Sequence, residues 1–359
     1  MQNLDENLRS LICDKIDTNG SISIKNFMEI VLYHPKFGYY YNNQIIGHKG
    51  DFITAPEINQ IFGELITICL IKQWEKFGKP NDFNLIEFGP GKGTLMLDIL
   101  RTANSFNFFS KSINPILFEK SKSLVKIQKK TLKQFNCLWV NSFEKIPEKP
   151  TFVIANEFLD SLPIDQIISY NNEWYKREIF HKKCELFFDK SYKLKVQPKF
   201  KPFSDGNIVE INNTAKIFIE KIINLISKHG FSAIFIDYGF PDNKIITGDT
   251  LKGIRNHKFA SIFKNLGSTD ISSWVNFSQI LETKPNEIIS HGPISQKMFL
   301  INLGIKERVE NIGHNILPNE RRKLLADFER LISISQMGKL FNVIGFSKKN
   351  YKKIPGFNY

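Results

Sequence analysis

The chain has 359 residues, of which 42% are hydrophobic and 32 are phenylalanine. That much apolar material is sufficient for a large α/β core with insertions, although the length exceeds that of one average domain. A membrane span requires about 20 consecutive apolar residues, and the longest candidate, residues 61–71, is interrupted by Gly63 and Glu64. We therefore interpret this stretch as a buried helix and expect no membrane insertion.

The chain is basic, with 49 Lys and Arg against 36 Asp and Glu and a net charge of +13. Such a charge is typical of proteins that bind nucleic acid or another acidic partner. Here the excess is mostly lysine spread along the whole chain, which is also rich in Ile, Asn and Phe. Compositional bias explains the charge as well as an acidic partner does, and nucleic acid is not the favoured partner.

Residues 1–6 carry acidic side chains before the first arginine and lack the features of a secretory signal or a transit peptide. We expect a cytoplasmic, bacterial protein, or one of the mitochondrial matrix if a leader has been removed. The cysteines are scattered, with no Cys-x-x-Cys pair and no histidine at metal spacing, so we expect reduced thiols and no metal site. They are Cys13, Cys69, Cys137 and Cys184.

Apolar side chains at helical spacing predict two helices near the start of the chain, within residues 1–30, with a turn at Asn19-Gly20 between them. A further helix is expected over residues 58–76. Three polar residues before it either bond the backbone at the start of that helix or close over the amino-acid end of a cofactor. These residues are Asp51, Thr54 and Glu57.

A glycine-rich turn follows the apolar run at residues 83–88 and leads directly into a helical pattern. A strand, a tight turn and a helix form the first half of a βαβ unit, and glycine allows a ligand to approach the main chain closely. The spacing fits neither the dinucleotide fingerprint nor the P-loop. The turn is therefore interpreted as the seat of a ligand, with a purely structural turn as the alternative. Its glycines are Gly89, Gly91 and Gly93, and Glu87 precedes them.

A second candidate ligand is Glu119, which ends a short apolar run 26 residues after Gly93 and precedes an amphipathic helix at residues 121–134. In a doubly wound sheet, an acidic side chain at the tip of the second strand can accept both hydroxyls of a ribose. The alternative is a solvated charge near a helix N-terminus.

Residues 151–155 predict a buried strand, and three polar residues follow its carboxyl end, where ligands of open α/β sheets bind. Glu157 and Asp160 are three positions apart, a spacing that can direct two carboxylates toward one cavity. Asn156 directly precedes them. A helix N-cap with an acid in its first turn is the alternative interpretation.

The rest of the chain predicts two inserted regions and further core elements. Alternating residues from Ile164 to about Lys199 predict a β-hairpin with a turn at Asn171-Asn172. Residues 248–300 are interpreted as a second insertion, in which isolated histidines are structural. Core elements are expected at 212–228 (helix), 233–239 (strand), 318–336 (helix) and 340–346 (antiparallel edge strand), and Asp237 lies either at the active-site edge or in a turn before Gly239.

Eight segments in this order resemble the MidA-like family of methyltransferases. They are YHPKFGYY at 33–40, GDFITAPE at 50–57, FGE at 62–64, EFGPGKGTLMLDILR at 87–101, ANEFLDSLP at 155–163, IDYG at 236–239, DTLKGIRNH at 249–257 and MGKLFNVIGFS at 337–347. Because they span nearly the whole chain, they are more specific than the glycine turn alone.

The resemblance implies an α/β fold of the Rossmann-like class I methyltransferase type, with a doubly wound, mostly parallel, seven-stranded sheet. It implies an N-terminal helical cap with a cofactor-covering loop at residues 1–80 and a methyltransferase core at 81–359. Insertions at about 164–205 and 248–300 are expected to form the substrate cleft. The sequence leaves the oligomeric state open, a homodimer included.

The resemblance also implies the cofactor, S-adenosyl-L-methionine, and the activity, protein arginine N-methylation of a subunit of respiratory complex I (NADH dehydrogenase) during assembly. The catalytic residues would be Glu157, Asp160 and Asn156. The cofactor-binding residues would be Glu87, Gly89, Gly91, Gly93, Glu119, Thr54, Pro56 and Glu57.

The implied chemistry is mainly positioning, because a sulfonium methyl group is already activated. Guanidinium is a poor nucleophile with a pKa above ~12, and carboxylates that hold two of its N–H groups would orient the third nitrogen. The chain departs from the family pattern at Lys252, at residues 270–277 and at Lys297-Met298. These departures weaken the inference about the target more than the one about the cofactor. A non-catalytic assembly chaperone and an RNA methyltransferase remain as alternatives.

Overall fold

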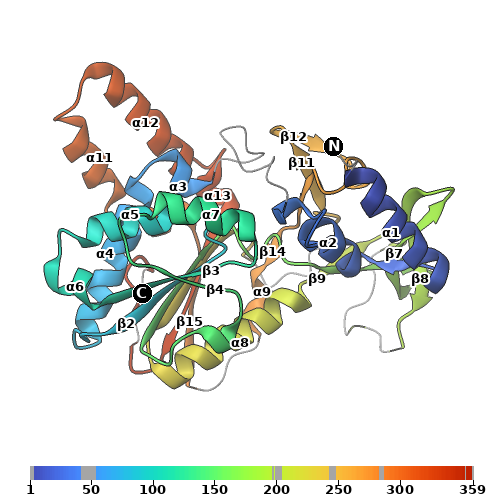
Figure 1. Ribbon diagram of the computed structural model, residues 1–359, viewed down its shortest axis with the longest axis horizontal. Helices are drawn as coiled ribbons and strands as arrows, with labels where there is room; N and C mark the ends of the chain where they lie inside the picture. Colours follow the sequence, from blue (N-terminus) through green and yellow to red (C-terminus); the bar gives the residue numbers. More distant parts are fainter. Residues whose placement is uncertain are drawn as a thin grey trace. The chain divides into compact units, whose positions relative to one another are not determined.

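A computed structural model describes residues 4–41, 54–195, 198, 204–241, 248–282, 287–351 and 353–357. The chain divides into two compact units, each built from separate stretches of sequence (Figure 1). The N-terminal unit comprises Met1–Phe52, Asp160–Ile217 and Asp242–Ile280, and the core unit comprises Ile53–Leu159, Phe218–Pro241 and Leu281–Tyr359. The expected N-terminal cap of residues 1–80 stays a prediction. The boundaries of the compact units differ from it, because residues 53–80 belong to the core unit.

The core unit contains a central sheet with the strand order β15-β16-β10-β5-β2-β3-β4. Neighbouring strands from β10 to β4 pair in parallel, and β16 pairs antiparallel with β10 and β15. This confirms the expected doubly wound sheet and the antiparallel pairing of the late strand. The expectation that this strand forms the edge is wrong, because β16 lies between β10 and β15. The strands are β2 Phe83–Phe88, β3 Ile113–Phe118, β4 Leu138–Val140, β5 Thr151–Asn156, β10 Ser232–Phe240, β15 Ile288–Ser295 and β16 Phe341–Lys348.

The helices of the core unit cover both faces of the sheet, with α4 and α5 packed together on one face and α8 on the other (Figure 1). Both faces are therefore buried, which explains why all residues of β2 and β5 are buried. The helices are α3 Ala55–Ile58, α4 Ile61–Lys76, α5 Thr94–Ala103, α6 Asn107–Ser112, α7 Lys122–Thr131, α8 Asn213–His229, α10 Gln296–Asn302, α11 Ile305–Gly313, α12 Pro318–Ile332 and α13 Met337–Leu340. None of the helices in the described ranges is both long and apolar enough to cross a membrane.

Gly63 explains the FGE segment at residues 62–64. A Cβ atom at this position would lie 2.5 Å from the Cβ of Asp98, so glycine is needed where α4 passes closest to α5. Gly63 therefore has a packing role in the core unit.

The N-terminal unit has its own sheet, β1-β7-β6-β9, with β8 added to β7, and a small sheet in the order β12-β11-β13. The turn between β6 and β7 places Asn171 and Asn172 at φ 52° and 61°, as a tight hairpin requires, so the predicted hairpin is confirmed. The elements are α1 Leu4–Asn19, β1 Ile22–Ser23, α2 Ile24–Tyr33, the 3-10 turn Tyr39–Tyr41, β6 Asp165–Tyr170, β7 Glu173–Lys182, β8 Glu185–Lys193, β9 Ile208–Ile211, β11 Lys252–Arg255, β12 Lys258–Ala260, β13 Asp270–Ser272, β14 Val275–Asn276 and α9 Phe277–Leu281.

Two strands of the core unit were not expected from the sequence, the short β4 at Leu138–Val140 and β15. The region expected as an insertion at 248–300 includes β15, which pairs with β16 as the last strand of the central sheet. β15 contains Gly292-Pro293 and a bulge between His291 and Ile294. Proline and glycine inside a strand are typical of edges and bulges, which hid this strand from a pattern-based prediction.

Candidate active site

The glycine loop connects β2 to α5 and has an unusual backbone. Gly89, Gly91 and Gly93 have φ values of 61°, 51° and 82°, a region that L side chains rarely adopt. A Cβ atom at Gly89 would lie 2.6 Å from the ring of Phe158, whereas one at Gly91 would meet no atom within 4 Å. Gly89 therefore permits close packing against the turn after β5, and Gly91 leaves main-chain atoms open to a ligand.

Glu87 lies in β2, two residues before the loop, and its side chain is buried. Burial raises the pKa of its carboxyl to about 8, and one hydrogen bond from the backbone N–H of Met96 opposes that shift. Oε2 of Glu87 has no hydrogen-bond partner among the described residues. A buried acceptor without a donor is costly, so this oxygen is suited to a donor supplied by a ligand.

Glu119 follows β3 and is tied to the glycine loop through Gln128. Glu119 accepts hydrogen bonds from the backbone of Ser121 at 2.8 Å and from Nε2 of Gln128 at 3.1 Å. The same Nε2 donates to the carbonyl of Gly91 at 2.8 Å, and Trp139 Nε1 donates to Oε1 of Gln128 at 3.0 Å. Burial raises the pKa of Glu119, which is therefore not a solvated helix-start charge.

Gln128 was not expected as a site residue, although its position on α7 carries one signal. It lies on α7, one helical turn after the buried Leu124, and it is itself fully buried. A polar side chain on the buried face of an amphipathic helix needs hydrogen-bond partners. Those partners are distant in the sequence and could not be identified from it.

The residues of α3 approach the glycine loop through one ion pair. Glu57 Oε1 lies 2.9 Å from Nζ of Lys92, the residue between the second and third glycines of the loop. Pro56 is buried near the start of the helix, and Thr54 occupies its N-cap position without a side-chain capping bond. Asp51 lies outside the described residues.

The carboxyl end of β5 presents Asn156 and Glu157. Phe88 pairs with Ala155, so the residues after both strands lie at the same edge of the sheet. Oε1 of Glu157 accepts hydrogen bonds from the backbone of Ala55 at 3.2 Å and from Nδ2 of Asn156 at 3.1 Å. Oδ1 of Asn156 is buried and has no hydrogen-bond partner in the described part of the chain.

Asp237 on β10 holds the turn that carries Glu157. Its Oδ2 accepts hydrogen bonds from the backbone N–H groups of Phe158 at 3.0 Å and Leu159 at 2.7 Å. Glu157 itself adopts φ 52° and no helix begins here, so the helix N-cap interpretation is wrong. The alternative of a turn before Gly239 is also wrong, because β10 continues to Phe240.

Asp160, the other predicted catalytic carboxylate, belongs to the N-terminal unit. Its carbonyl accepts a hydrogen bond from the backbone of Ser273 at 3.0 Å. Its side chain is close enough to Tyr40 to contribute, after burial, Asp270 and Tyr33, to the raised pKa of that phenol. Tyr40 donates to Oδ1 of Asp270 at 3.4 Å, so the aromatic segment at 33–40 packs against acidic side chains in this unit.

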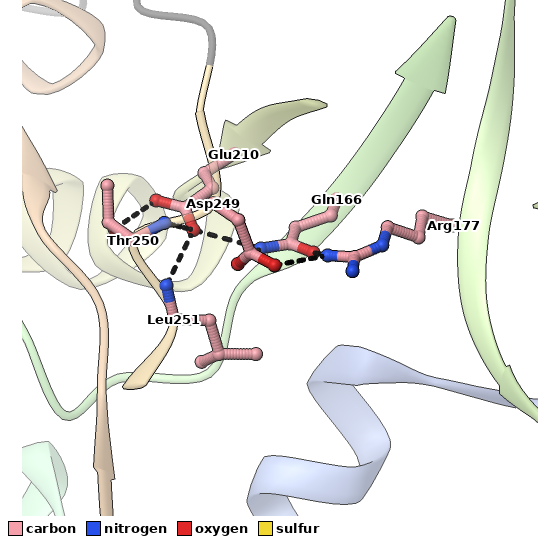
Figure 2. Close-up of polar contacts among 6 residues, drawn as sticks. All are labelled: Gln166, Arg177, Glu210, Asp249, Thr250 and Leu251. Atoms are coloured by element: carbon pink, nitrogen blue, oxygen red, sulfur yellow. Dashed lines mark hydrogen bonds and ion pairs between the residues drawn. The ribbon is translucent and has the colours of Figure 1, made fainter. Parts of the chain in front are cut away.

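A closed polar network fixes the start of the DTLKGIRNH segment. Figure 2 shows its members, which are Gln166, Arg177, Glu210, Asp249, Thr250 and Leu251. Glu210 accepts from the backbone of Thr250 at 2.9 Å and of Leu251 at 3.1 Å, and Arg177 pairs with Asp249 at 2.8 Å. These bonds hold residues 249–251 on the sheet of the N-terminal unit, which is a structural role.

Comparison with known proteins identifies the family. A family model described as "Putative S-adenosyl-L-methionine-dependent methyltransferase" matches residues 65–294. The chain belongs to this family. It is 31% identical to the human protein named "Protein arginine methyltransferase NDUFAF7, mitochondrial" over 96% of this chain and 84% of that protein. The zebrafish protein of the same name is 29% identical, over 94% of this chain and 86% of that protein.

A solved structure from Burkholderia thailandensis, bound to S-adenosyl-homocysteine, has the same fold. Its TM-score is 0.82 at 24% identity, and the alignment covers 98% of this chain and 94% of that one. The methyltransferase fold is therefore established for this member of the family, and so is its cofactor, S-adenosyl-L-methionine. The resemblance noted from eight sequence segments is confirmed.

Proposed function

We propose that the edge of the central sheet formed by the glycine loop and the end of β5 binds S-adenosyl-L-methionine. Gly91 leaves its backbone open, and Oε2 of Glu87 and Oδ1 of Asn156 are buried acceptors that lack a donor among the described residues. The cofactor brings amino and hydroxyl donors together with its activated methyl group. The residues proposed to hold it are Glu87, Gly89, Gly91, Gly93, Glu119, Thr54, Pro56 and Glu57.

Glu119 suits the ribose because its acceptor capacity is not exhausted. A carboxylate offers about four lone-pair sites, and three hydrogen bonds, from the backbone of Ser121 and Lys120 and from Gln128, use some of them. Gln128 fixes this carboxylate relative to the carbonyl of Gly91. A ligand resting on the glycine loop would therefore meet Glu119 in a fixed orientation.

We propose protein arginine N-methylation as the reaction, with Glu157, Asp160 and Asn156 as its catalytic residues. The observation that carries this proposal is the fixed Glu157 carboxylate, held by Ala55 and Asn156 at the same sheet edge as the glycine loop. A guanidinium group is cationic and planar, and a fixed carboxylate can orient it by charge-assisted hydrogen bonds. The names of the curated relatives support the same acceptor.

The proposed role of Glu157 is to align one guanidinium nitrogen with the methyl carbon and to stabilise positive charge during the transfer. The nitrogen forms the new bond to carbon while the carbon–sulfur bond breaks, and the methylated guanidinium then loses one proton. Asp160 is the proposed second carboxylate that holds the guanidinium group, a role based on the family resemblance. The Asp160→Asn variant tests this role separately from that of Glu157.

The proposed target is a subunit of respiratory complex I, methylated during assembly, in the bacterial cytoplasm or the mitochondrial matrix. The curated relatives are named mitochondrial, and the family resemblance includes the complex I assembly factor. Mass spectrometry of complex I subunits, from cells with and without this protein, tests the target. Loss of one methylated arginine when the protein is absent is the expected result.

The reaction is tested with Glu157→Gln and Asp160→Asn, assayed separately on the identified subunit with labelled cofactor. We expect Glu157→Gln to lower the rate by about 10²–10³-fold, as for loss of a positioned electrostatic group, with S-adenosyl-homocysteine affinity nearly unchanged. Glu148→Gln, an exposed acid of the core unit, is the matched control. Methylation by Glu157→Gln at the control rate would exclude the proposed role.

A further inference from the structure

Three metal-ligating side chains from two distant segments meet in the N-terminal unit. They are Cys13 on α1, His181 near the end of β7, and Cys184 in the turn between β7 and β8. The two sulfur atoms and one imidazole nitrogen lie within 4.8 Å of one another. The sequence analysis found no histidine at metal spacing and overlooked this His-x-x-Cys pair across a tight turn.

The separation of these atoms fits a tetrahedral zinc ion. With Zn–S bonds of about 2.3 Å and Zn–N bonds of about 2.0–2.1 Å, ligand atoms around zinc lie about 3.5–3.8 Å apart. An upper limit of 4.8 Å therefore requires side-chain movements of only about 1 Å. No such movement needs the helix or the hairpin to unfold.

Asp17 already orients the histidine as a zinc ligand requires. Nε2 of His181 lies 2.9 Å from Oδ1 of Asp17, and Nδ1 accepts a long hydrogen bond of 3.3 Å from the backbone of Cys184. The carboxylate therefore engages Nε2, and Nδ1 would bind the metal with its one lone pair, in exchange for the long bond from Cys184. Metal-bound histidines commonly donate their second N–H to a carboxylate in this way.

Burial and charge also favour a metal over two free thiols. Cys13 is 3% exposed, so a charged thiolate at this position needs a partner of opposite charge. Zinc with two thiolates and a neutral imidazole carries no net charge, which suits a buried position. Arg9 donates to the carbonyl of Cys184 at 3.3 Å and adds positive charge beside the thiolates.

The backbone of Cys184 gives a further reason to expect a specific role. Lys183 and Cys184 form a two-residue turn with φ values of 50° and 60°. Such turns favour asparagine and glycine, and the neighbouring hairpin follows that rule with Asn171 and Asn172. Cysteine is therefore an uncommon residue at this position of the turn.

We propose that Cys13, His181 and Cys184 bind one Zn²⁺ ion, with water in the fourth position and Asp17 orienting His181. The ion would connect α1 to the β7–β8 hairpin and stabilise the N-terminal unit. All of these residues lie in that unit, and none of them is among the residues assigned to the cofactor or to methyl transfer.

The test uses the full-length protein, freed of metal under reducing conditions and titrated with Co²⁺ and then Zn²⁺. We expect one equivalent of Co²⁺ to give a thiolate-to-cobalt charge-transfer band, which one equivalent of Zn²⁺ removes. Zinc should also raise the melting temperature. Cys184→Ser should abolish the charge-transfer band, and Asp17→Asn should weaken zinc binding by about 10–100-fold.

Cys137→Ser is the matched control, because Cys137 belongs to the core unit and lies outside the group. This variant should bind one equivalent of zinc with unchanged affinity. His181→Asn provides a second test should Cys184→Ser fold poorly. No charge-transfer band in the wild-type protein, a band retained in both ligand variants, or a native Cys13–Cys184 disulfide would each overturn the proposal.

Discussion

Two buried carboxylates, Glu210 in the N-terminal unit and Glu87 in the core unit, lie on strands but have different surroundings. Glu210 accepts hydrogen bonds from Gln166, Thr250 and Leu251, and both of its oxygens are used. Glu87 accepts a hydrogen bond from the backbone of Met96, while its Oε2 has no partner in the described part of the chain. Burial raises the pKa of both carboxyls.

The number of hydrogen-bond donors around each carboxylate distinguishes a structural role from a binding role. A buried carboxylate whose oxygens are supplied with donors by its own protein has nothing to offer a ligand, and its removal leaves those donors unsatisfied. A buried carboxylate oxygen that has no hydrogen-bond donor, next to an open glycine loop, can gain a hydrogen bond from a ligand. Removing the first kind should therefore cost stability, and removing the second kind should alter binding and pH dependence.

The largest effect is expected for Glu210→Ala. The variant leaves the donors of Gln166, Thr250 and Leu251 without an acceptor. At about 1–3 kcal/mol for each unsatisfied buried group, unfolding should become easier by about 3–5 kcal/mol. Urea denaturation measures this loss. Glu185→Gln, on the exposed start of β8, should change stability by less than about 0.5 kcal/mol. A small loss for Glu210→Ala would mean that the network is not a brace.

The next effect is the pH dependence caused by Glu87. Its pKa is about 8 when folded and 4.5 as the ordinary value, so the folded state retains the proton more strongly than the unfolded state. The contribution of Glu87 to the free energy of unfolding is then largest below about pH 4.5. It falls as the pH rises toward 8, by at most about 1.4 kcal/mol per pH unit.

Glu87→Gln should remove this fall, because an amide does not titrate. Unfolding titrations of both proteins at several pH values measure the difference. Binding of a cationic cofactor group should also release a proton from wild-type Glu87 near pH 7, which calorimetry detects in buffers of different ionisation enthalpy. If the free energy of unfolding of both proteins varied with pH in the same way, the Glu87 carboxyl could not be protonated in the folded state near pH 7.

Gly91→Ala is expected to affect binding more than folding. The left-handed backbone at Gly91 makes alanine unfavourable by about 1–2 kcal/mol, and the new methyl group would enter the open space over the loop. The dissociation constant for S-adenosyl-homocysteine should rise at least about tenfold, as measured by calorimetry.

Gly20→Ala is the matched control for this variant. Gly20 has φ 82°, and a Cβ atom at this position would also meet no atom within 4 Å, but Gly20 lies in the turn between α1 and β1. The variant should lose similar stability while keeping wild-type affinity for S-adenosyl-homocysteine. Equal affinities for the Gly20 and Gly91 variants would show that the loop is a structural turn only.

The sequence predicted elements whose signal is local. The apolar run at 83–88, three glycines and a helical pattern are adjacent in the chain, so β2, the loop and α5 were all expected. The hairpin at Asn171-Asn172 was expected for the same reason. The roles assigned to Glu157 and Asp160 stay predictions, since their three-residue spacing does not by itself establish a shared site.

Features that depend on distant residues could not be predicted. Gln128 gains its role from Gly91 and Trp139, neither of which lies on its own helix. The Cys13 group needs the β7–β8 hairpin to bring two of its members to α1. In each case single residues look ordinary in the sequence, and only the tertiary structure places their functional atoms together.

The smallest effect, on cofactor affinity, is expected for Gln128→Leu. This variant tests whether Gln128 orients Glu119 for binding. Leucine keeps the buried volume on α7 but removes the two hydrogen bonds that connect Glu119 to the carbonyl of Gly91, together with the one that Trp139 donates to Gln128. Glu119 keeps its bond from Ser121, so the carboxylate is less well oriented rather than lost. The dissociation constant for S-adenosyl-homocysteine should rise by about 3–10-fold, corresponding to one hydrogen bond of about 1 kcal/mol. The matched control is Gln134→Leu, at an exposed position beyond the end of α7, which should leave this dissociation constant unchanged.

Calorimetry reports affinity per folded molecule. An unaltered dissociation constant for Gln128→Leu would therefore mean that Glu119 is positioned by its own backbone turn and not by the glycine loop.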